Sequence, residues 1–207
     1  MNTQPEIVYV VDDDEAVRDS LTWLLESNGY TVKCQPSAER FLQSLQGEQK
    51  DIVACLILDV RMPGMSGLEL QERLMAEGIP MPISFITGHG DVSMAVSTMK
   101  KGAIDFIEKP FKESELKVLV EKMLAKARIA YAKANTQKNT QNLLSKLTGR
   151  EKQVLERIVA GRLNKQIADD LNISIKTVEA HRANIMEKLN VNTVADLLRL
   201  ALSETTA

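Results

Sequence analysis

Apolar runs typical of buried strands alternate with helix-patterned stretches over the first 125 residues, and this alternation constrains the fold more than any other feature. Strands are predicted at residues 7–11, 31–34, 52–58, 83–86 and 104–107. Helical spacing of apolar residues predicts helices at residues 16–25, 37–46, 67–76, 92–101 and 112–130. Strands that alternate with helices form a parallel sheet covered on both faces. We therefore expect an α/β fold with a doubly wound, five-stranded parallel sheet.

The rest of the chain has no strand pattern. A stretch rich in Ala, Lys, Asn and Gln, without Pro or Gly, is expected to extend the fifth helix and to lose helical character at residues 135–142. Further on, breaks at Gly161, residues 172–174 and residues 190–192 separate four short predicted helices. The expected domains are residues 1–125 and residues 146–207, joined by a helical linker at residues 126–145.

Charge and composition limit the kinds of partner. The net charge is −2, yet acidic residues prevail in residues 1–125 and basic residues prevail afterwards, so the two ends suit different partners. No apolar run approaches the roughly 18 residues of a membrane span, and the N-terminus lacks the basic start of a secretory signal. We expect a cytoplasmic protein without a membrane partner. In it, Cys34 and Cys55 stay reduced, and two Cys with two distant His form no zinc site.

Acidic side chains end two of the predicted strands, and a lysine ends a third. The first strand runs into Asp12, Asp13 and Asp14, the third ends at Asp59, and the fifth is followed by Lys109. Ligands bind beyond the carboxyl ends of parallel strands. Two carboxylates 4 Å apart repel by roughly 4 kcal/mol at an effective dielectric of 20, so a cation is expected, and hard oxygen ligands favour Mg²⁺. We interpret Asp14 separately, as a cap for the helix that follows.

This constellation is suited to phosphoryl transfer. A carboxylate can attack phosphorus to give an aspartyl-phosphate, and such transfer needs mainly positioning and charge neutralisation. Mg²⁺, the Lys109 ammonium and the hydroxyl of Thr87, at the end of the fourth strand, would each cover one phosphoryl oxygen. Gly88 would leave room for the incoming group. We therefore predict that Asp59 is the phosphoacceptor.

The C-terminal helices contain a helix-turn-helix spacing. Thr148 and Glu151 form a capping box at the start of the first helix. Residues 164–189 read as two helices joined by a short turn, with small residues on the outer side of the second helix, which allow close approach to DNA. A charged helix face can also be merely solvated. The predicted DNA-contacting residues are Lys165, Lys176, Thr177, Glu179, Ala180, Arg182, Ala183 and Lys188.

Residues 5–125 resemble the receiver domain of two-component response regulators. The motifs are Val10-Val11-Asp12-Asp13-Asp14, Leu58-Asp59-Val60-Arg61-Met62-Pro63-Gly64-Met65-Ser66-Gly67, Thr87-Gly88-His89-Gly90-Asp91 and Lys109-Pro110-Phe111. The resemblance implies a CheY-like (flavodoxin-like) fold and phosphorylation of Asp59 by a partner sensor histidine kinase. It also implies that Asp13, Asp59 and the backbone carbonyl of Arg61 bind Mg²⁺, that Asp12 acts through water, and that the Lys109–Pro110 bond is cis.

The resemblance further implies a conformational switch. The Thr87 hydroxyl moves towards the phosphoryl group while the ring of Phe106 turns inward. A dimer surface at residues 92–107 is then exposed. His89 and Arg61 flank the site and could tune loss of the phosphoryl group to water. The receiver is thereby expected to promote its own phosphorylation and dephosphorylation without being an enzyme in the usual sense.

Residues 148–203 resemble the LuxR-type, four-helix DNA-binding domain. Together the two parts resemble the NarL–FixJ group of response regulators, with the residues after Thr87 closest to the FixJ-like branch. The resemblance implies homodimerisation on phosphorylation, binding to double-stranded promoter DNA and contact with RNA polymerase, so that transcription is regulated, and activation is expected.

Two other classes of protein compete with this interpretation. A Mg²⁺-dependent phosphohydrolase would need a substrate pocket or cap, and no insertion here is long enough to form one. A constitutive DNA-binding protein with an inactive receiver would not need Asp13, Asp59, Thr87 and Lys109, all of which are present.

Overall fold

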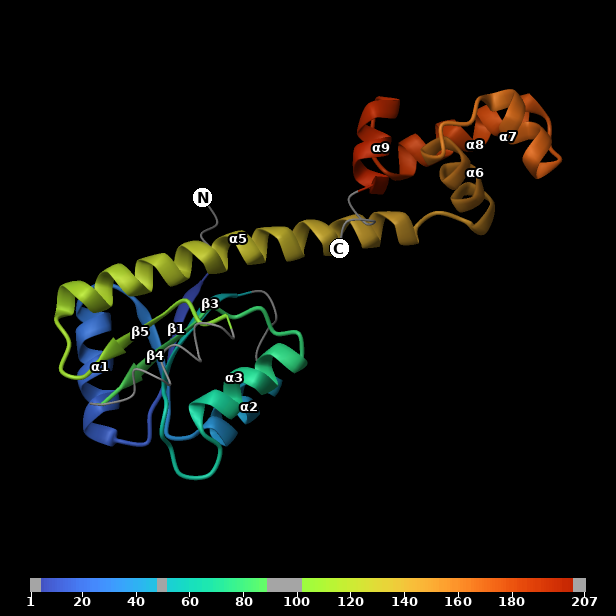
Figure 1. Cartoon of the computed structure of the whole chain (residues 1–207). Helices are drawn as coiled ribbons and strands as arrows, with labels where there is room; N and C mark the ends of the chain where they lie inside the picture. The colour runs from blue at the N-terminus through green and yellow to red at the C-terminus, as the bar shows by residue number, and fades with distance from the viewer. Residues whose placement is uncertain (1–4, 48–51, 89–101, 203–207) are drawn as a thin grey trace. The chain divides into compact units, whose positions relative to one another are not determined.

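The chain divides into two compact units, Met1–Ala132 and Lys133–Ala207. A computed structural model describes residues 5–47, 52–88 and 102–202. The strands of the first unit are β1 (Glu6–Val11), β2 (Thr31–Gln35), β3 (Val53–Asp59), β4 (Ile83–Thr87) and β5 (Asp105–Glu108). They are parallel and lie in the order β2-β1-β3-β4-β5 (Figure 1). This is the flavodoxin-like order, whose switch point between β1 and β3 is a preferred ligand site, and it confirms the predicted fold class.

Helices cover both faces of the sheet. On one face lie α1 (Glu15–Ser27) and the first part of α5 (Glu113–Ser145), and on the other lie α2 (Ala38–Gly47) and α3 (Gly67–Ala76). Successive side chains of a strand point to opposite faces. Accordingly, Val10 packs with α1 and α5, whereas its neighbours Tyr9 and Val11 pack with α2 and α3. The predicted helix at residues 92–101 lies outside the described residues.

Helix α5 is longer than the sequence suggested. The prediction that helical structure is lost at residues 135–142 was wrong, because α5 continues without a break to Ser145. Ala, Lys, Gln and Arg have favourable helix propensities, and the Asn and Thr residues among them cost only a few tenths of a kcal/mol each. Without Gly or Pro, polar composition alone does not end the helix.

The second unit contains the four predicted short helices: α6 (Gly149–Val159), α7 (Asn164–Leu171), α8 (Ile175–Lys188) and α9 (Val194–Leu202). The predicted capping box is present, since Thr148 Oγ1 accepts from the Glu151 N–H at 3.3 Å and Glu151 Oε2 accepts from the Thr148 N–H at 2.8 Å. Asn172 and Asn190 end α7 and α8 with φ of 52° and 51°, a left-handed conformation that Asn tolerates. The buried core includes Val154, Ile158, Ile167, Val178, Ile185 and Leu197.

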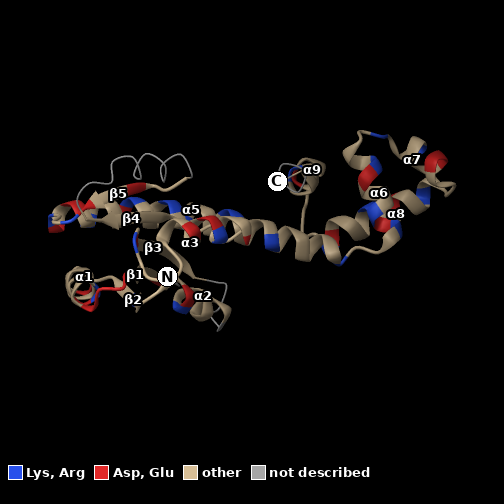
Figure 2. Cartoon of the chain, turned by 60° about the horizontal axis from the view of Figure 1, so that its bottom comes forward, with Lys and Arg blue, Asp and Glu red and all other residues tan. Residues whose placement is uncertain are grey.

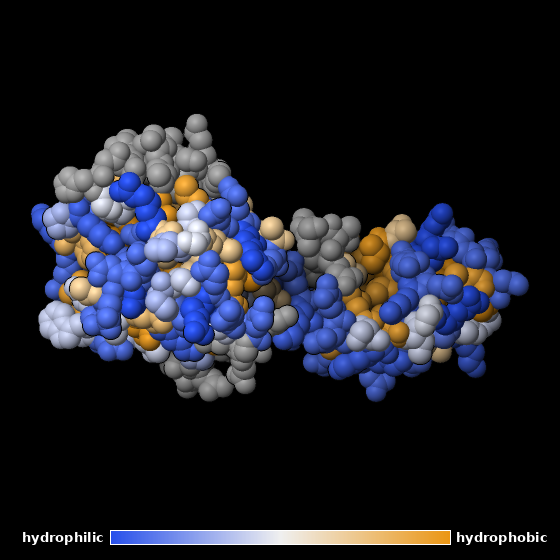
Figure 3. Space-filling model, turned by 90° about the horizontal axis from the view of Figure 1, so that it is seen from below, coloured by the Kyte–Doolittle hydropathy of each residue, from blue (hydrophilic) through white to orange (hydrophobic). Residues whose placement is uncertain are grey.

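Two further predictions concern the state of the cysteines and whether the chain spans a membrane. Cys34 and Cys55 are both free, as expected. Within the described residues, no helix is both long and apolar enough to span a membrane. Hydrophobic side chains such as Trp23, Ile129 and Leu163 are exposed, and Figure 3 shows hydrophobic residues scattered among hydrophilic ones on both units. Scattered exposure of this kind is normal for a folded protein and marks no interface by itself.

Candidate functional site

Neighbouring strand ends bring Asp12 and Asp59 together. Val11 pairs with Leu58 in the β1–β3 register, so Asp12 and Asp59 each lie one residue further along their strands. Both side chains are largely buried, with exposures of 3% and 12%. Asp13, the next residue, is exposed to solvent. The predicted acidic cluster therefore consists of two buried carboxylates and one exposed carboxylate.

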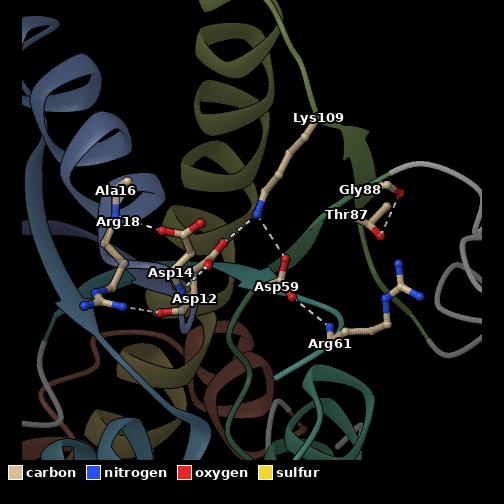
Figure 4. A network of polar contacts seen from close by, with 9 residues as sticks. All are labelled: Asp12, Asp14, Ala16, Arg18, Asp59, Arg61, Thr87, Gly88 and Lys109. Atoms are coloured by element: carbon tan, nitrogen blue, oxygen red, sulfur yellow. Dashed lines mark hydrogen bonds and ion pairs between the residues drawn. The ribbon is translucent and has the colours of Figure 1, made fainter. Parts of the chain in front are cut away.

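The Lys109 ammonium bridges the two buried carboxylates (Figure 4). Its Nζ lies 2.7 Å from Asp12 Oδ2 and 3.1 Å from Asp59 Oδ1. Burial raises the pKa of Asp59, although the hydrogen bond and charge of Lys109 oppose this. Burial alone would lower the pKa of Lys109, but Asp12 and Asp59 outweigh burial and raise it. The lysine thus balances charge that would otherwise be repulsive at the switch point of the sheet.

Backbone N–H groups hold the other carboxylate oxygens. Asp59 Oδ2 accepts from the Arg61 N–H at 2.7 Å, and Asp12 Oδ1 accepts from the Asp14 N–H at 2.9 Å. Asp14 Oδ1 in turn accepts from the Ala16 N–H at 2.9 Å and caps α1, as the sequence predicted. Each aspartate therefore has a distinct local role.

The carboxylate oxygens at the strand ends determine whether Mg²⁺ can bind there. Within residues 5–47, 52–88 and 102–202, no group of three acidic, His or Cys side chains is assembled as a complete metal site. Mg²⁺, however, commonly uses one or two carboxylates together with phosphate oxygens and several waters. The carboxylates of Asp12, Asp13 and Asp59 are ligands of this hard-oxygen type. The residues fit a water-rich Mg²⁺ site but not a closed protein cage.

The fourth and fifth strands contribute the remaining predicted residues. Thr87 is buried at the end of β4, and its hydroxyl donates to the Gly88 carbonyl at 3.3 Å. A Cβ added to Gly88 would meet nothing within 4 Å, so the space there is open without requiring glycine. The Phe106 side chain on β5 is 39% exposed. The Lys109–Pro110 bond is cis, as the resemblance implied, whereas His89 lies outside the described residues.

Helix α8 presents a mixed outer face. Val178 and Ile185 are buried, whereas Lys176, Glu179, Ala180 and Ala183 are exposed, as a recognition helix requires. Residues of both charges lie on the helices of this unit (Figure 2).

Two hydroxyls cap the start of α8. The Ser174 hydroxyl accepts from the Thr177 N–H at 3.0 Å and lies 2.8 Å from Thr177 Oγ1. Thr177, one of the predicted DNA-contacting residues, is therefore part of the cap, although it is exposed.

The predicted phosphate-contacting residues differ in their surroundings. Lys165 on α7 is exposed and Arg182 on α8 is partly exposed. Lys188 is instead bonded within the unit: its Nζ lies 2.7 Å and 2.9 Å from the two carboxylate oxygens of Glu151. The Glu151 side chain is only 4% exposed, and a buried carboxylate needs a counter-charge. This pairing replaces the assignment of Lys188 to DNA phosphate.

Comparison with known proteins finds a matching family for each of the two units. The response regulator receiver domain family matches residues 8–121, and the bacterial regulatory protein luxR family matches residues 145–201. The chain belongs to the response regulator family. It is 43% identical over 195 residues to the transcriptional regulatory protein FixJ of Bradyrhizobium diazoefficiens, a match that covers 94% of each chain.

This response regulator is also similar to two further relatives. It is 46% identical over 207 residues to the response regulator protein TmoT of Ectopseudomonas mendocina, with 97% of this chain and 90% of TmoT covered. The solved structure of the response regulator StyR matches with a TM-score of 0.83 and 46% identity, over 96% of this chain and 98% of StyR. These matches extend across both units, so the two-part organisation is shared with known regulators.

Two positions of the response regulator lie next to the candidate sites, although neither was assigned a role from the sequence. A Cβ on Gly67 would lie 2.1 Å from the Asp59 carbonyl oxygen, so only glycine fits at the start of α3. Asn184 is exposed on α8, one residue beyond Ala183. The helical period of α8 was the available signal for Asn184, whereas the Gly67 contact depends on tertiary structure.

Proposed function

We propose that Asp59 accepts a phosphoryl group from the phosphohistidine of a sensor histidine kinase. The observation that carries this proposal is the Lys109 ammonium held between Asp12 and Asp59 at the switch point of the sheet. An Asp59 carboxylate oxygen forms a bond to phosphorus, and the phosphorus–nitrogen bond breaks with its electron pair returning to the kinase imidazole. Positioning and charge neutralisation supply most of the catalysis in such transfers.

The neighbouring residues have defined roles in this reaction. The Lys109 ammonium donates to one phosphoryl oxygen, and the buried Thr87 hydroxyl turns from the Gly88 carbonyl to donate to another. Asp12, Asp13, Asp59 and the backbone carbonyl of Arg61 would hold Mg²⁺. The bound cation neutralises developing negative charge on the phosphoryl oxygens. The phosphorylated state is transient, because water later attacks phosphorus, the bond from phosphorus to the Asp59 oxygen breaks, and inorganic phosphate leaves the free carboxylate.

The output of this site is control of transcription in the cytoplasm. We assign residues 1–125 to the receiver, 126–145 to a helical linker and 146–207 to the DNA-binding domain. Phosphorylation shifts the receiver towards a state that forms a homodimer, with Phe106 turned inward. The dimer binds double-stranded promoter DNA through α8 and contacts RNA polymerase. Known regulators such as FixJ support this proposal because they resemble the chain over nearly its whole length.

Acetyl phosphate with Mg²⁺ tests the phosphoacceptor directly. Intact-mass measurement of the full chain should show the addition of one phosphoryl group, and Asp59→Asn should remove this addition. Asp19→Asn is the matched control, because Asp19 is an exposed aspartate on α1, away from the strand ends. Labelling of Asp59→Asn at the parent level would show that another residue accepts the phosphoryl group.

A further inference from the structure

The outer face of α8 carries two side chains of opposite charge that form no ion pair with the described residues of the second unit. Lys176 and Glu179, the second and fifth residues of α8, are exposed. In the part of the chain that the structure describes, neither side chain has a hydrogen bond or ion pair. Two other polar side chains of this helix are engaged within the unit, since Thr177 lies 2.8 Å from Ser174 and Lys188 is paired with Glu151. Lys176 and Glu179 are therefore available for a ligand.

Small neighbours make these two side chains prominent. Ala180 and Ala183 lie on the same exposed side of α8 and do not keep a ligand away from the helix. Residues three apart on a helix are neighbours, with roughly 5–6 Å between their Cβ atoms. When a helix of this kind lies in a major groove, its N-terminal residues meet the base edges. Lys176 and Glu179 belong to the first two turns of α8 and so meet the groove floor together.

A carboxylate in this position restricts the choice of base. The groove is lined by phosphates, which repel an unpaired Glu179, so its placement there requires a hydrogen-bond donor. Cytosine offers the N4 amino group as its polar major-groove atom, whereas the N6 amino group of adenine lies beside the N7 acceptor. The second acceptor would repel a carboxylate. Cytosine is therefore the favoured partner of Glu179.

Lys176 completes the pattern. The guanine that pairs with this cytosine presents the O6 and N7 acceptors, to which a lysine ammonium donates. We propose that Lys176 and Glu179 together recognise one G·C base pair in the major groove, with Lys176 on the guanine and Glu179 on the cytosine amino group. The inference rests on the proposed DNA-binding function and deepens it by assigning a base pair to two side chains.

Selection from a pool of double-stranded oligonucleotides with a randomised stretch tests the assignment. The full chain, treated with acetyl phosphate and Mg²⁺, should enrich one G·C pair in each half-site by roughly tenfold or more. Glu179→Gln should change the selected cytosine to adenine, because Gln donates to N7 and accepts from N6. Glu179→Ala and Lys176→Ala should both relax the preference at this same base pair.

Glu187→Gln is the matched control. Glu187 is exposed in the last turn of α8, beyond the turns that meet the bases, so its replacement should leave base preferences unchanged. A Glu179→Ala variant that binds all sequences more tightly, with unchanged preferences, would show that Glu179 only repels phosphate. Relaxation of two different base pairs by Lys176→Ala and Glu179→Ala would overturn the single-pair assignment.

Failure of the proposed DNA-binding function can be distinguished from failure of the base-pair assignment. If the parent protein shows no salt-dependent binding to any duplex, the DNA-binding proposal itself is wrong. If the parent binds selectively but Glu179→Gln keeps the parent base preferences, only the assignment of Glu179 is wrong. Circular dichroism should show the same helix content for every variant, since each substitution is on the exposed face of α8.

Discussion

Lys109 is the residue on which charge balance at the proposed phosphoacceptor site depends. Replacing Lys109 with Met keeps a side chain of similar length but leaves Asp12 and Asp59 as two close, uncompensated carboxylates. We expect the initial rate of labelling by acetyl phosphate to fall about 100-fold, the typical loss for one charged stabilising group. Lys112→Met is the control, because Lys112 is exposed three residues further along. Equal labelling rates for Lys109→Met and the parent would exclude this role.

Gly67 affects the same aspartate through the backbone. Gly67→Ala would place a Cβ 2.1 Å from the Asp59 carbonyl oxygen, so either α3 or the end of β3 must move. Overpacking of this kind costs about 1–3 kcal/mol of the free energy of unfolding. Urea unfolding followed by far-ultraviolet circular dichroism should report this loss, together with slower labelling of Asp59. Gly149→Ala, at the first residue of α6, has open space around the new Cβ, so that control should show no loss of stability and a gain of at most about 1 kcal/mol.

Single residues differ in how far the sequence reveals their role. The cap formed by Asp14 was predictable because its partner, Ala16, lies two residues away. The pairing of Lys188 with Glu151 spans 37 residues and was missed. A basic residue near a helix end has the same local pattern whether it contacts phosphate or a buried carboxylate. Only the packing of α6 against α8 distinguishes the two roles.

At the scale of elements, the Glu151–Lys188 ion pair joins the start of α6 to the end of α8. The hydrogen bond from Lys188, with that of the Thr148 N–H, lowers the pKa of Glu151 to about 2. Glu151→Gln should reduce the free energy of unfolding of the second unit by about 1–3 kcal/mol near neutral pH. Urea unfolding followed at the Ile158 methyl NMR signal measures this change, and the exposed Glu156 provides the control Glu156→Gln.

The same pair has a defined pH dependence. Because the folded pKa of Glu151 lies below its ordinary value of 4.5, the stabilisation is complete above about pH 4.5 and is lost as the pH falls towards about 2. The parent should therefore lose more unfolding free energy between pH 7 and pH 3 than Glu151→Gln does. Parallel acid profiles for the two proteins would assign the acid sensitivity to other groups.

Elements were easier to predict than their exact ends. Strands β1 and β3 were recognisable because an apolar run rich in Val, Ile and Leu leads into an acid, Asp12 after β1 and Asp59 at the end of β3. The length of α5 was underestimated because a polar surface and a polar linker share one composition. Helix propensity is nearly neutral there, so continuation to Ser145 depends on the absence of a stop signal.

At the scale of the whole molecule, the first part of the chain is acidic and the remainder is basic. This distribution suits phosphoryl transfer in the first unit and contact with DNA in the second. Asp59→Asn should therefore separate two properties of DNA binding. Its affinity should not respond to acetyl phosphate, since Asn cannot form the acyl phosphate, whereas the parent should bind more tightly after treatment. Before treatment, both proteins should show the same steep loss of affinity with salt, because counterion release depends on the number of phosphates contacted by the second unit. Fluorescence anisotropy with a labelled duplex at several salt concentrations measures both properties. If Asp59→Asn flattened the salt dependence of the untreated protein, the receiver itself would take part in phosphate contact, and the division of tasks between the two units would be wrong.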